Sequence, residues 1–139
     1  MMKRVVVGKS LGFIVGLIGF VCMPYVFPEV SMMTRVGILF WYTLMGGMIA
    51  VFGVIDYHPV LKMRLNAWVR GVILGGSMNL ALVLVGYAAI QPLMQSATIF
   101  TGMSPFWLVL EGAVVAVVID LVLTKKTGEG SSLCQSTVA

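Results

Sequence analysis

Residues 8–19 read GKSLGFIVGLIG, an apolar stretch that contains four glycines. In water, glycine in a helix costs about 1 kcal/mol relative to alanine. In a lipid bilayer no hydrophobic effect drives helices together, and small residues let two backbones approach closely. At about 100° per residue the four glycines fall within about 80° of one another on a helix; they are Gly8, Gly12, Gly16 and Gly19. The stretch therefore predicts a transmembrane helix with a glycine packing face.

The composition of the whole chain also points to a membrane. Of its 139 residues, 60% are hydrophobic and 10% are charged, whereas soluble domains carry about 25% charged residues. The chain has too few polar side chains to cover a surface that faces water. A spanning helix needs about 20 apolar residues, and the sequence contains four such stretches. They are residues 10–28, 36–55, 71–90 and 105–124.

These stretches predict an all-α membrane protein with four transmembrane helices arranged in two hairpins. The first stretch has the basic flank of a signal peptide but lacks a cleavage site of small residues, so we expect an anchor that is not cleaved. Residues 1–126 form the expected transmembrane domain. Residues 127–139 are rich in Ser, Gly and Thr and lack an apolar period, which predicts a disordered cytoplasmic tail.

The basic residues are unevenly distributed over the expected loops. Every Lys and Arg except Arg35 lies before the first stretch, between the second and third, or after the fourth. Cytoplasmic segments of membrane proteins carry an excess of Lys and Arg. We therefore expect both termini to be cytoplasmic, in a plasma or inner membrane, with anionic lipid head groups near these residues. No basic domain lies outside the expected helices, which argues against nucleic acid as a partner.

The other three stretches have faces of small residues as well. Those of the second stretch are Thr43, Gly46, Ala50 and Gly53. Those of the third share about 80° of the helix surface and are Gly71, Gly75, Asn79 and Gly86. Those of the fourth are Gly112 and Ala116. Four such faces predict a tight, glycine-packed bundle with little room for a pore. We interpret Asn79 as polar glue between helices, worth about 0.6–2 kcal/mol.

Glu111 is the foremost functional candidate in the sequence. It lies about seven residues, or about 10 Å, inside the outer boundary of the fourth stretch. A charge at that depth is costly, and an ionisable residue inside a membrane marks a functional site by default. Trp107 and Leu108 share its side of the helix, whereas Gly112 and Ala116 lie about 100–140° away. We therefore expect Glu111 to point to a flank or out of the bundle, toward a subunit or partner interface.

Asp120 calls for a different interpretation, because it lies near the cytoplasmic end of the fourth stretch. Lys9 lies at the matching depth of the first stretch, beside the glycine face. Opposite charges at one depth predict a structural Lys9–Asp120 ion pair. Trp41 and Tyr42 lie deeper than the aromatic residues of a membrane interface do, and the sequence alone does not explain them.

Two functional hypotheses follow. The leading one is a small non-enzymatic protein that acts through helix–helix contacts, by self-association or as an accessory, assembly or immunity-type partner of another membrane protein. The second is a small proton-coupled exporter that uses Glu111 and works as an oligomer. Four spans and one buried acid resemble the small multidrug resistance transporters in topology, although the acid of that family lies in the first helix. The sequence shows no catalytic set, metal-ligand cluster or cofactor motif, so we expect neither enzymatic activity nor a cofactor.

Overall fold

The computed structural model describes residues 2–55, 57–58, 62–99 and 101–128. It contains four helices, which are α1 (Met2–Val26), α2 (Met32–Phe52), α3 (Ala67–Ser96) and α4 (Trp107–Thr127). All four are long and apolar enough to cross a membrane. The prediction of an all-helical chain with four helices of transmembrane length is therefore confirmed.

Local signals explain where the helices begin and end. Ser31 caps α2, because its hydroxyl accepts a hydrogen bond from the backbone N–H of Thr34 at 3.1 Å. Pro28 follows the end of α1 and cannot continue a helix, and Gly128, with a φ of 77°, ends α4. α3 extends beyond the predicted stretch at both ends, since hydropathy marks the apolar part of a helix and not its caps. The expected tail, residues 127–139, lies outside the described residues from position 129 onward.

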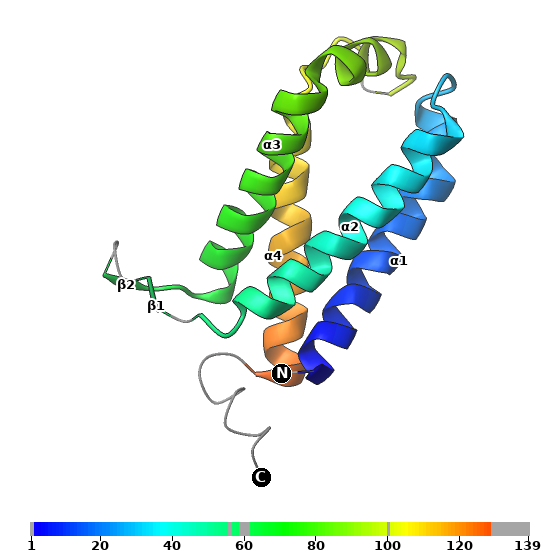
Figure 1. The fold of residues 1–139 in the computed structure, drawn as a ribbon. Helices are drawn as coiled ribbons and strands as arrows, with labels where there is room; N and C mark the ends of the chain where they lie inside the picture. Colours follow the sequence, from blue (N-terminus) through cyan, green and yellow to red (C-terminus); the bar gives the residue numbers. More distant parts are fainter. Residues whose placement is uncertain (1, 56, 59–61, 100, 129–139) are drawn as a thin grey trace.

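The helices pack mainly as two pairs. Most contacts between helices join α1 to α2 and α3 to α4, and fewer contacts join one pair to the other. Figure 1 shows that the start of α1 and the end of α4 lie at the same end of the bundle. We call this the terminal end. The loop between α1 and α2 and the start of α4 lie at the opposite end, which we call the distal end.

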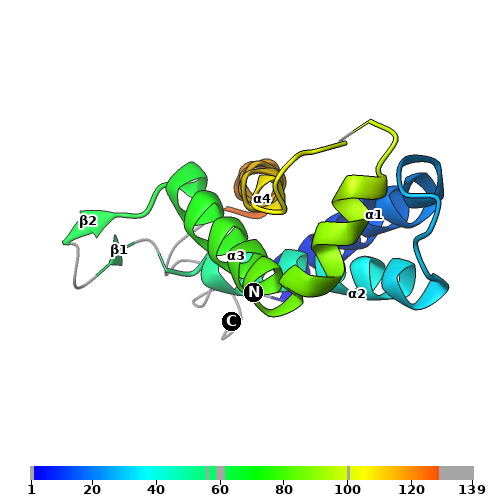
Figure 2. The same ribbon diagram turned by 90° about the horizontal axis from the view of Figure 1, so that it is seen from above.

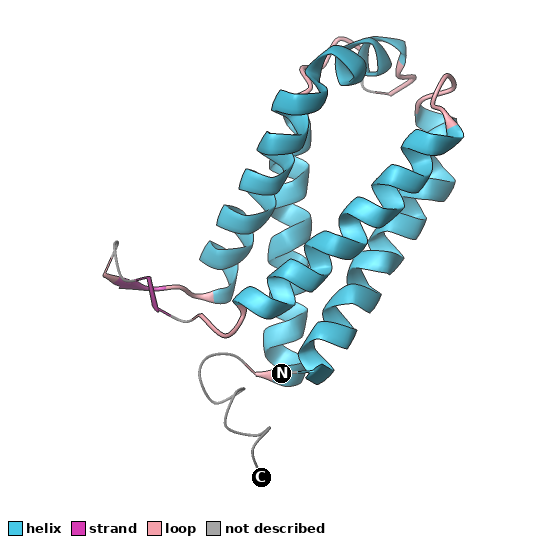
Figure 3. Cartoon of the chain, in the orientation of Figure 1, coloured by secondary structure: helices cyan, strands magenta, loops and turns pink. Residues whose placement is uncertain are grey.

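The connection between α2 and α3 contains a short antiparallel ribbon that the sequence analysis does not predict. β1 (Tyr57–His58) pairs with β2 (Met63–Arg64), so that Tyr57 lies opposite Arg64. Figure 3 shows the ribbon projecting from the terminal end, away from the helices. An isolated two-stranded ribbon of this size is marginal in stability, so the helices determine the fold.

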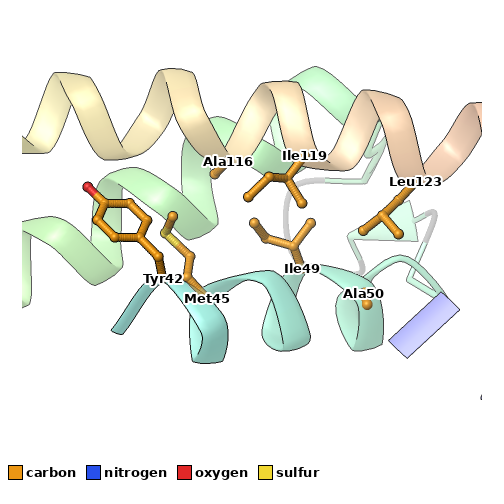
Figure 4. Packing of buried hydrophobic residues seen from close by; sticks show 7 residues of the cluster. All are labelled: Tyr42, Met45, Ile49, Ala50, Ala116, Ile119 and Leu123. Carbon is orange, nitrogen blue, oxygen red and sulfur yellow. The ribbon is translucent and has the colours of Figure 1, made fainter. Parts of the chain in front are cut away.

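A cluster of buried apolar side chains joins the two pairs along the contact between α2 and α4 (Figure 4). The residues from α2 are Tyr42, Met45, Ile49 and Ala50, and those from α4 are Ala116, Ile119 and Leu123. In Figure 4 the side chains of Ile49 and Ile119 point toward one another. α4 therefore packs against α2 as well as against α3, and Glu111 lies on the side of α4 that faces α2.

α3 bends near its C-terminal end, and its last turns lie across the distal end of the bundle. Pro92 lies inside the helix and has no N–H to donate, which explains the bend. In Figure 2 the turns after the bend run toward α1. There the backbone N–H of Thr98 donates to the Val26 carbonyl at 2.9 Å, and Met94 and Ala97 are buried. The bent end of α3 thereby covers the space between the two pairs.

Candidate functional site

Glu111 lies inside the bundle, where α2, α3 and α4 meet. The Tyr42 hydroxyl of α2 donates a hydrogen bond to Glu111 Oε2 at 2.5 Å, and the Asn79 amide of α3 donates to the same oxygen at 3.4 Å. Tyr42 and Asn79 are buried, and Glu111 is half-buried. In the part of the chain that the structure describes, no basic side chain forms an ion pair with Glu111. Neutral donors from two other helices therefore hold the acid.

Asn79 connects this acid to Trp41. Trp41 Nε1 donates to Asn79 Oδ1 at 2.9 Å, and Asn79 Nδ2 donates to the Leu108 carbonyl of α4 at 2.8 Å. An indole nitrogen can only donate and a carbonyl can only accept, so these two neighbours fix the orientation of the amide. Trp41, Tyr42, Asn79 and Glu111 form one hydrogen-bonded group, which we call the polar cluster.

The predicted direction of Glu111 is wrong. We expected the acid to turn away from the bundle because the small residues of the same helix, Gly112 and Ala116, lie about 100–140° away from it. That argument assumes a single packing face on α4, whereas α4 contacts both α3 and α2. Gly112 faces Asn79 of α3, and Glu111 faces Tyr42 of α2. The acid lies on the second packing face, so its direction no longer favours a partner interface.

A cavity of about 320 Å³ lies beside the polar cluster, in the distal half of the bundle. Trp41, Tyr42 and Asn79 are among the residues that line it, and we call these three residues of the polar cluster its floor. The walls are mostly apolar and include Met23, Phe27, Ile38, Leu82, Leu93 and Met94. Sites for small molecules usually measure about 300–1,000 Å³ and combine apolar walls with a few polar groups. The size and the lining of this cavity fit a small ligand.

Gly86 lines this cavity, although the sequence places it on the packing face of α3. An added Cβ on Gly86 would meet only Ile90 of its own helix within 4 Å. Nearer the terminal end, the same face lies directly against α4, because a Cβ on Gly71 would be 2.6 Å from an α4 Cα atom. This face of α3 packs against α4 in the first half of the helix and lines the cavity in the second half. The predicted packing role of Gly86 is therefore wrong.

Asp120 forms a second polar group at the terminal end. Its carboxylate contacts Arg4 of α1 (Oδ1 to Nη2, 2.7 Å) and Arg70 of α3 (Oδ2 to Nε, 2.7 Å). All three side chains are at most 2% exposed. Arg4 Nε also donates to the Ala50 carbonyl of α2 at 3.1 Å, and Arg4 Nη1 donates to the Gly128 carbonyl. This group, which we call the arginine cluster, connects all four helices.

The predicted Lys9–Asp120 pair is wrong, since no ion pair joins these two described residues. Arg4 takes the position instead. It lies four residues before Gly8, so it continues the buried glycine face, and it is buried together with Gly8, Gly12 and Gly16. Lys9 lies one residue past that face and is exposed, and its aliphatic carbons lie against Gly47 of α2.

Three of the four predicted glycines of α1 lie directly against the backbone of α2. A Cβ added to any of them would come within 3.0 Å of a backbone carbonyl oxygen of α2, closer than real Cβ atoms approach. They are Gly8, Gly12 and Gly16. Gly19, nearer the distal end, has more space, because its added Cβ would have only Ile38 Cγ2 within 4 Å, at 3.4 Å.

A similar close approach occurs between α3 and α4. A Cβ on Gly75 would overlap the Gly112 carbonyl, and a Cβ on Gly112 would overlap the Asn79 side chain. Ala116 is buried beside Gly75. Asn79 therefore lies in a tight contact and also hydrogen-bonds to both α2 and α4.

The sequence analysis does not assign four residues of these two groups, namely Arg4, Arg70, Trp41 and Tyr42. Two signals could have identified them. Arg4 continues the four-residue spacing of the glycine face, which predicts a buried position. The polar tips of Trp and Tyr usually have hydrogen-bond partners when these side chains are buried, so two such residues deep in a span indicate polar partners nearby.

Comparisons with known proteins identify no relative. No family model, no curated protein and no solved structure matches the chain. The functional argument therefore depends on the geometry of the polar cluster and the cavity.

Proposed function

We propose that this protein is a non-enzymatic, multi-pass membrane protein that carries a small lipophilic molecule in the cavity and exchanges a proton at Glu111. One observation carries the proposal. An ionisable side chain that forms no ion pair among the described residues adjoins a ligand-sized cavity through Tyr42 and Asn79. Ionisable residues inside membranes mark substrate paths and proton relays. The second of the two sequence hypotheses, the proton-coupled exporter, is thus the better supported.

The polar cluster is suited to hold Glu111 with or without its proton. When the proton leaves, the donors Tyr42 and Asn79 stabilise the carboxylate, because hydrogen bonds to a charged acceptor are strong. When the proton returns, the same group is a neutral acid among neutral neighbours. A fixed cation beside Glu111 would favour the charged form alone, and the described residues place none there. A bound molecule on the floor of the cavity contacts this group directly.

We further propose that the glycine faces hold each helix pair together as one unit. The close approach of Gly12 to α2 and of Gly75 to α4 supports this. Fewer contacts join the two pairs, so the pairs can move against each other more easily than the helices within a pair. Relative motion of two such units around a fixed site is a common basis for transport.

In the proposed orientation the two pairs are hairpins, and both termini face the cytoplasm of a plasma or inner membrane. The basic residues at the terminal end support this, as Lys3 and Lys125 lie there with the arginine cluster. Anionic lipid head groups are the expected partners of the exposed lysines. Reporter fusions at Ala139 and Ser96 test the orientation, and periplasmic activity at Ala139 would contradict it.

Proton coupling is tested in proteoliposomes with a pH-sensitive dye inside. The probes are dodecanol, dodecylamine, dodecanoate and a methyl ketone of the same length. We expect at least one probe to drive proton movement by the wild type. Glu111→Gln keeps the shape of the side chain and its hydrogen-bonding capacity but cannot titrate, so it should fold and lose this movement. Full activity of Glu111→Gln would show that the acid is only a structural hydrogen-bond partner.

The role of the cavity is tested by filling it. Gly37 lines the cavity, and an added Cβ there would have no described atom within 4 Å apart from its chain neighbours and the backbone of its own helix. Gly37→Leu should therefore fold, occupy the cavity and abolish transport. Gly76→Leu is the matched control, because Gly76 does not line the cavity and its added Cβ would meet only Ala113, at 3.9 Å. Equal transport by both variants would exclude the cavity as the site.

A partner protein is the second candidate function, as the leading sequence hypothesis has it. The small residues Gly37 and Gly86 in the wall of the cavity favour it, because small residues allow another helix to approach closely. A pull-down in mild detergent with mass spectrometry tests this candidate. A stoichiometric membrane partner, or a second copy of this chain, that is lost in Gly37→Leu and kept in Gly76→Leu would support it.

A further inference from the structure

We propose that the molecule bound in the cavity combines an apolar tail with a head group that donates a hydrogen bond, such as a hydroxyl or an amine. This inference rests on the proposed function and adds the chemical class of the ligand. It follows from the hydrogen bonds that the floor of the cavity already makes and from those that it can still accept.

Every donor on the floor is already engaged. The indole N–H of Trp41 is donated to Asn79 Oδ1, and the Tyr42 hydroxyl is donated to Glu111 Oε2. The Asn79 amide has two N–H groups, and it donates to the Leu108 carbonyl and to Glu111 Oε2. A ligand that needs a donor from the floor would have to break one of these bonds, which are shared between three helices.

Two oxygen atoms of the floor can still accept hydrogen bonds. A phenolic oxygen that donates its proton can still accept a hydrogen bond, and a carbonyl oxygen has two lone pairs. The Tyr42 oxygen and Asn79 Oδ1, which accepts one bond from Trp41, can therefore each accept another. A head group that donates finds two acceptors without disturbing the polar cluster.

The charges around the cavity agree with this assignment. No Lys, Arg, Asp or Glu is among the described residues that line the cavity. Glu111 lies directly behind Tyr42 and Asn79, so a carboxylate or phosphate head would face an acid without a compensating cation. A ketone or ester head presents only acceptors to the remaining acceptors of the floor. A buried polar group without a hydrogen-bond partner costs about 1–3 kcal/mol, and these heads therefore bind more weakly.

The walls explain the apolar tail. They are lined mainly by aliphatic and aromatic side chains, and Met23 and Met94 give them flexible surfaces that adapt to different shapes. Gly37 leaves an open part of the wall, since its added Cβ has no described atom within 4 Å beyond its chain neighbours and the backbone of its own helix. The cavity therefore accepts a flexible or branched chain and selects mainly on the head group.

Trp41 provides a direct reporter of binding. Trp68→Phe and Trp107→Phe leave Trp41 as the single tryptophan, and neither replaced residue lines the cavity. This variant is placed in nanodiscs of neutral phospholipid and titrated with bromine-labelled dodecanol, dodecylamine, dodecanoate and a methyl ketone of the same length. Bromine quenches the fluorescence of Trp41 when a probe occupies the cavity. Gly37→Leu in the same background measures quenching by probe dissolved in the bilayer, and Gly76→Leu controls for the substitution itself.

We expect the alcohol and the amine to bind about tenfold more tightly than the ketone, because the ketone oxygen finds no free donor on the floor and stays unpaired. Dodecanoate should bind most weakly. Tighter binding of the amine than of the alcohol would assign a cationic head, and equal binding would show that the floor recognises the donated hydrogen bond and not the charge. A ketone or carboxylate that binds as tightly as the alcohol would overturn the donor head and leave the carrier in place. If every probe quenches Trp41 equally in the single-tryptophan variant with Gly37 intact and in the one that carries Gly37→Leu, the cavity is not a ligand site, and the proposed function fails with it.

Discussion

The two ends of the bundle hold their buried acids in different ways. At the terminal end, Asp120 contacts two arginines from two other helices at 2.7 Å each. Backbone carbonyls and the hydroxyls of Thr124 and Thr127 accept further hydrogen bonds from these arginines. In the distal half, the donors to Glu111 in the described part of the chain are the neutral side chains of Tyr42 and Asn79, and a cavity adjoins them. Depth alone does not distinguish these two acids. They differ in the charges of their partners, which are positive at Asp120 and neutral at Glu111.

This difference separates a structural site from a site that can change. Arg4 and Arg70 both contact the carboxylate of Asp120, so removing its negative charge would leave buried positive charge behind. An acid held by neutral donors can gain or lose a proton while its partners remain in place. The arginine cluster therefore keeps the four helices together at the terminal end. In the proposed function, the polar cluster is the place where protonation or a ligand alters the bundle.

The largest effect that we expect comes from removing the carboxylate of Asp120. Asp120→Asn keeps the shape but withdraws the charge that Arg4 and Arg70 both contact. Breaking a buried ion pair by removal of one partner costs about 3–5 kcal/mol. We expect a clear loss of folded protein and a lower midpoint of thermal unfolding in detergent.

Lys9→Gln is the control for this prediction, because Lys9 is exposed and forms no ion pair among the described residues. Its unfolding midpoint should match that of the wild type. If Lys9→Gln is as destabilising as Asp120→Asn, then Lys9 supports the acid after all, and the assignment of Arg4 and Arg70 fails.

A smaller effect should reveal how the contact between α1 and α2 loosens toward the distal end. A Cβ on Gly12 would overlap the backbone carbonyl of Tyr42, which cannot move aside, so Gly12→Ala should cost about 1–3 kcal/mol. Gly19→Ala should be neutral or stabilising. Its new Cβ would make an ordinary contact at 3.4 Å, and alanine is the better helix former by about 1 kcal/mol.

Chemical unfolding of the two alanine variants in parallel measures this difference. Both changes add one methyl group to the same helix, so they differ chiefly in what that methyl group meets. Equal losses of stability at the two positions would mean that the contact is equally tight along its length. The difference between the terminal and distal ends would then not apply to the contact between the glycine face of α1 and α2.

The helices were predictable from the sequence because hydropathy is a local property, and four apolar stretches of sufficient length are visible without tertiary information. The sequence predicted that Asp120 pairs with a basic residue of the first helix, but it did not identify the correct one. Depth allowed Lys9, but the four-residue spacing before Gly8 places Arg4 on the buried face, and a guanidinium group makes more hydrogen bonds than an ammonium group. The direction of Glu111 depends on α4 packing against two helices. That is a property of the assembled bundle, which the pattern on one helix cannot reveal.

The smallest expected effect on stability is also the sharpest test of the comparison. Tyr42→Phe removes one neutral donor from Glu111 and fills nearly the same space. Hydrogen bonds between helices in a membrane contribute about 0.6 kcal/mol on average, and Asn79 still donates to Glu111 Oε2. We therefore expect only a slight fall in the unfolding midpoint, measured beside Tyr25→Phe, whose side chain is 79% exposed. The acid at the terminal end should be far more sensitive to the loss of a partner. A loss of stability in Tyr42→Phe as large as that in Asp120→Asn would mean that Glu111 is a fixed structural charge, and proton exchange at this site would be excluded.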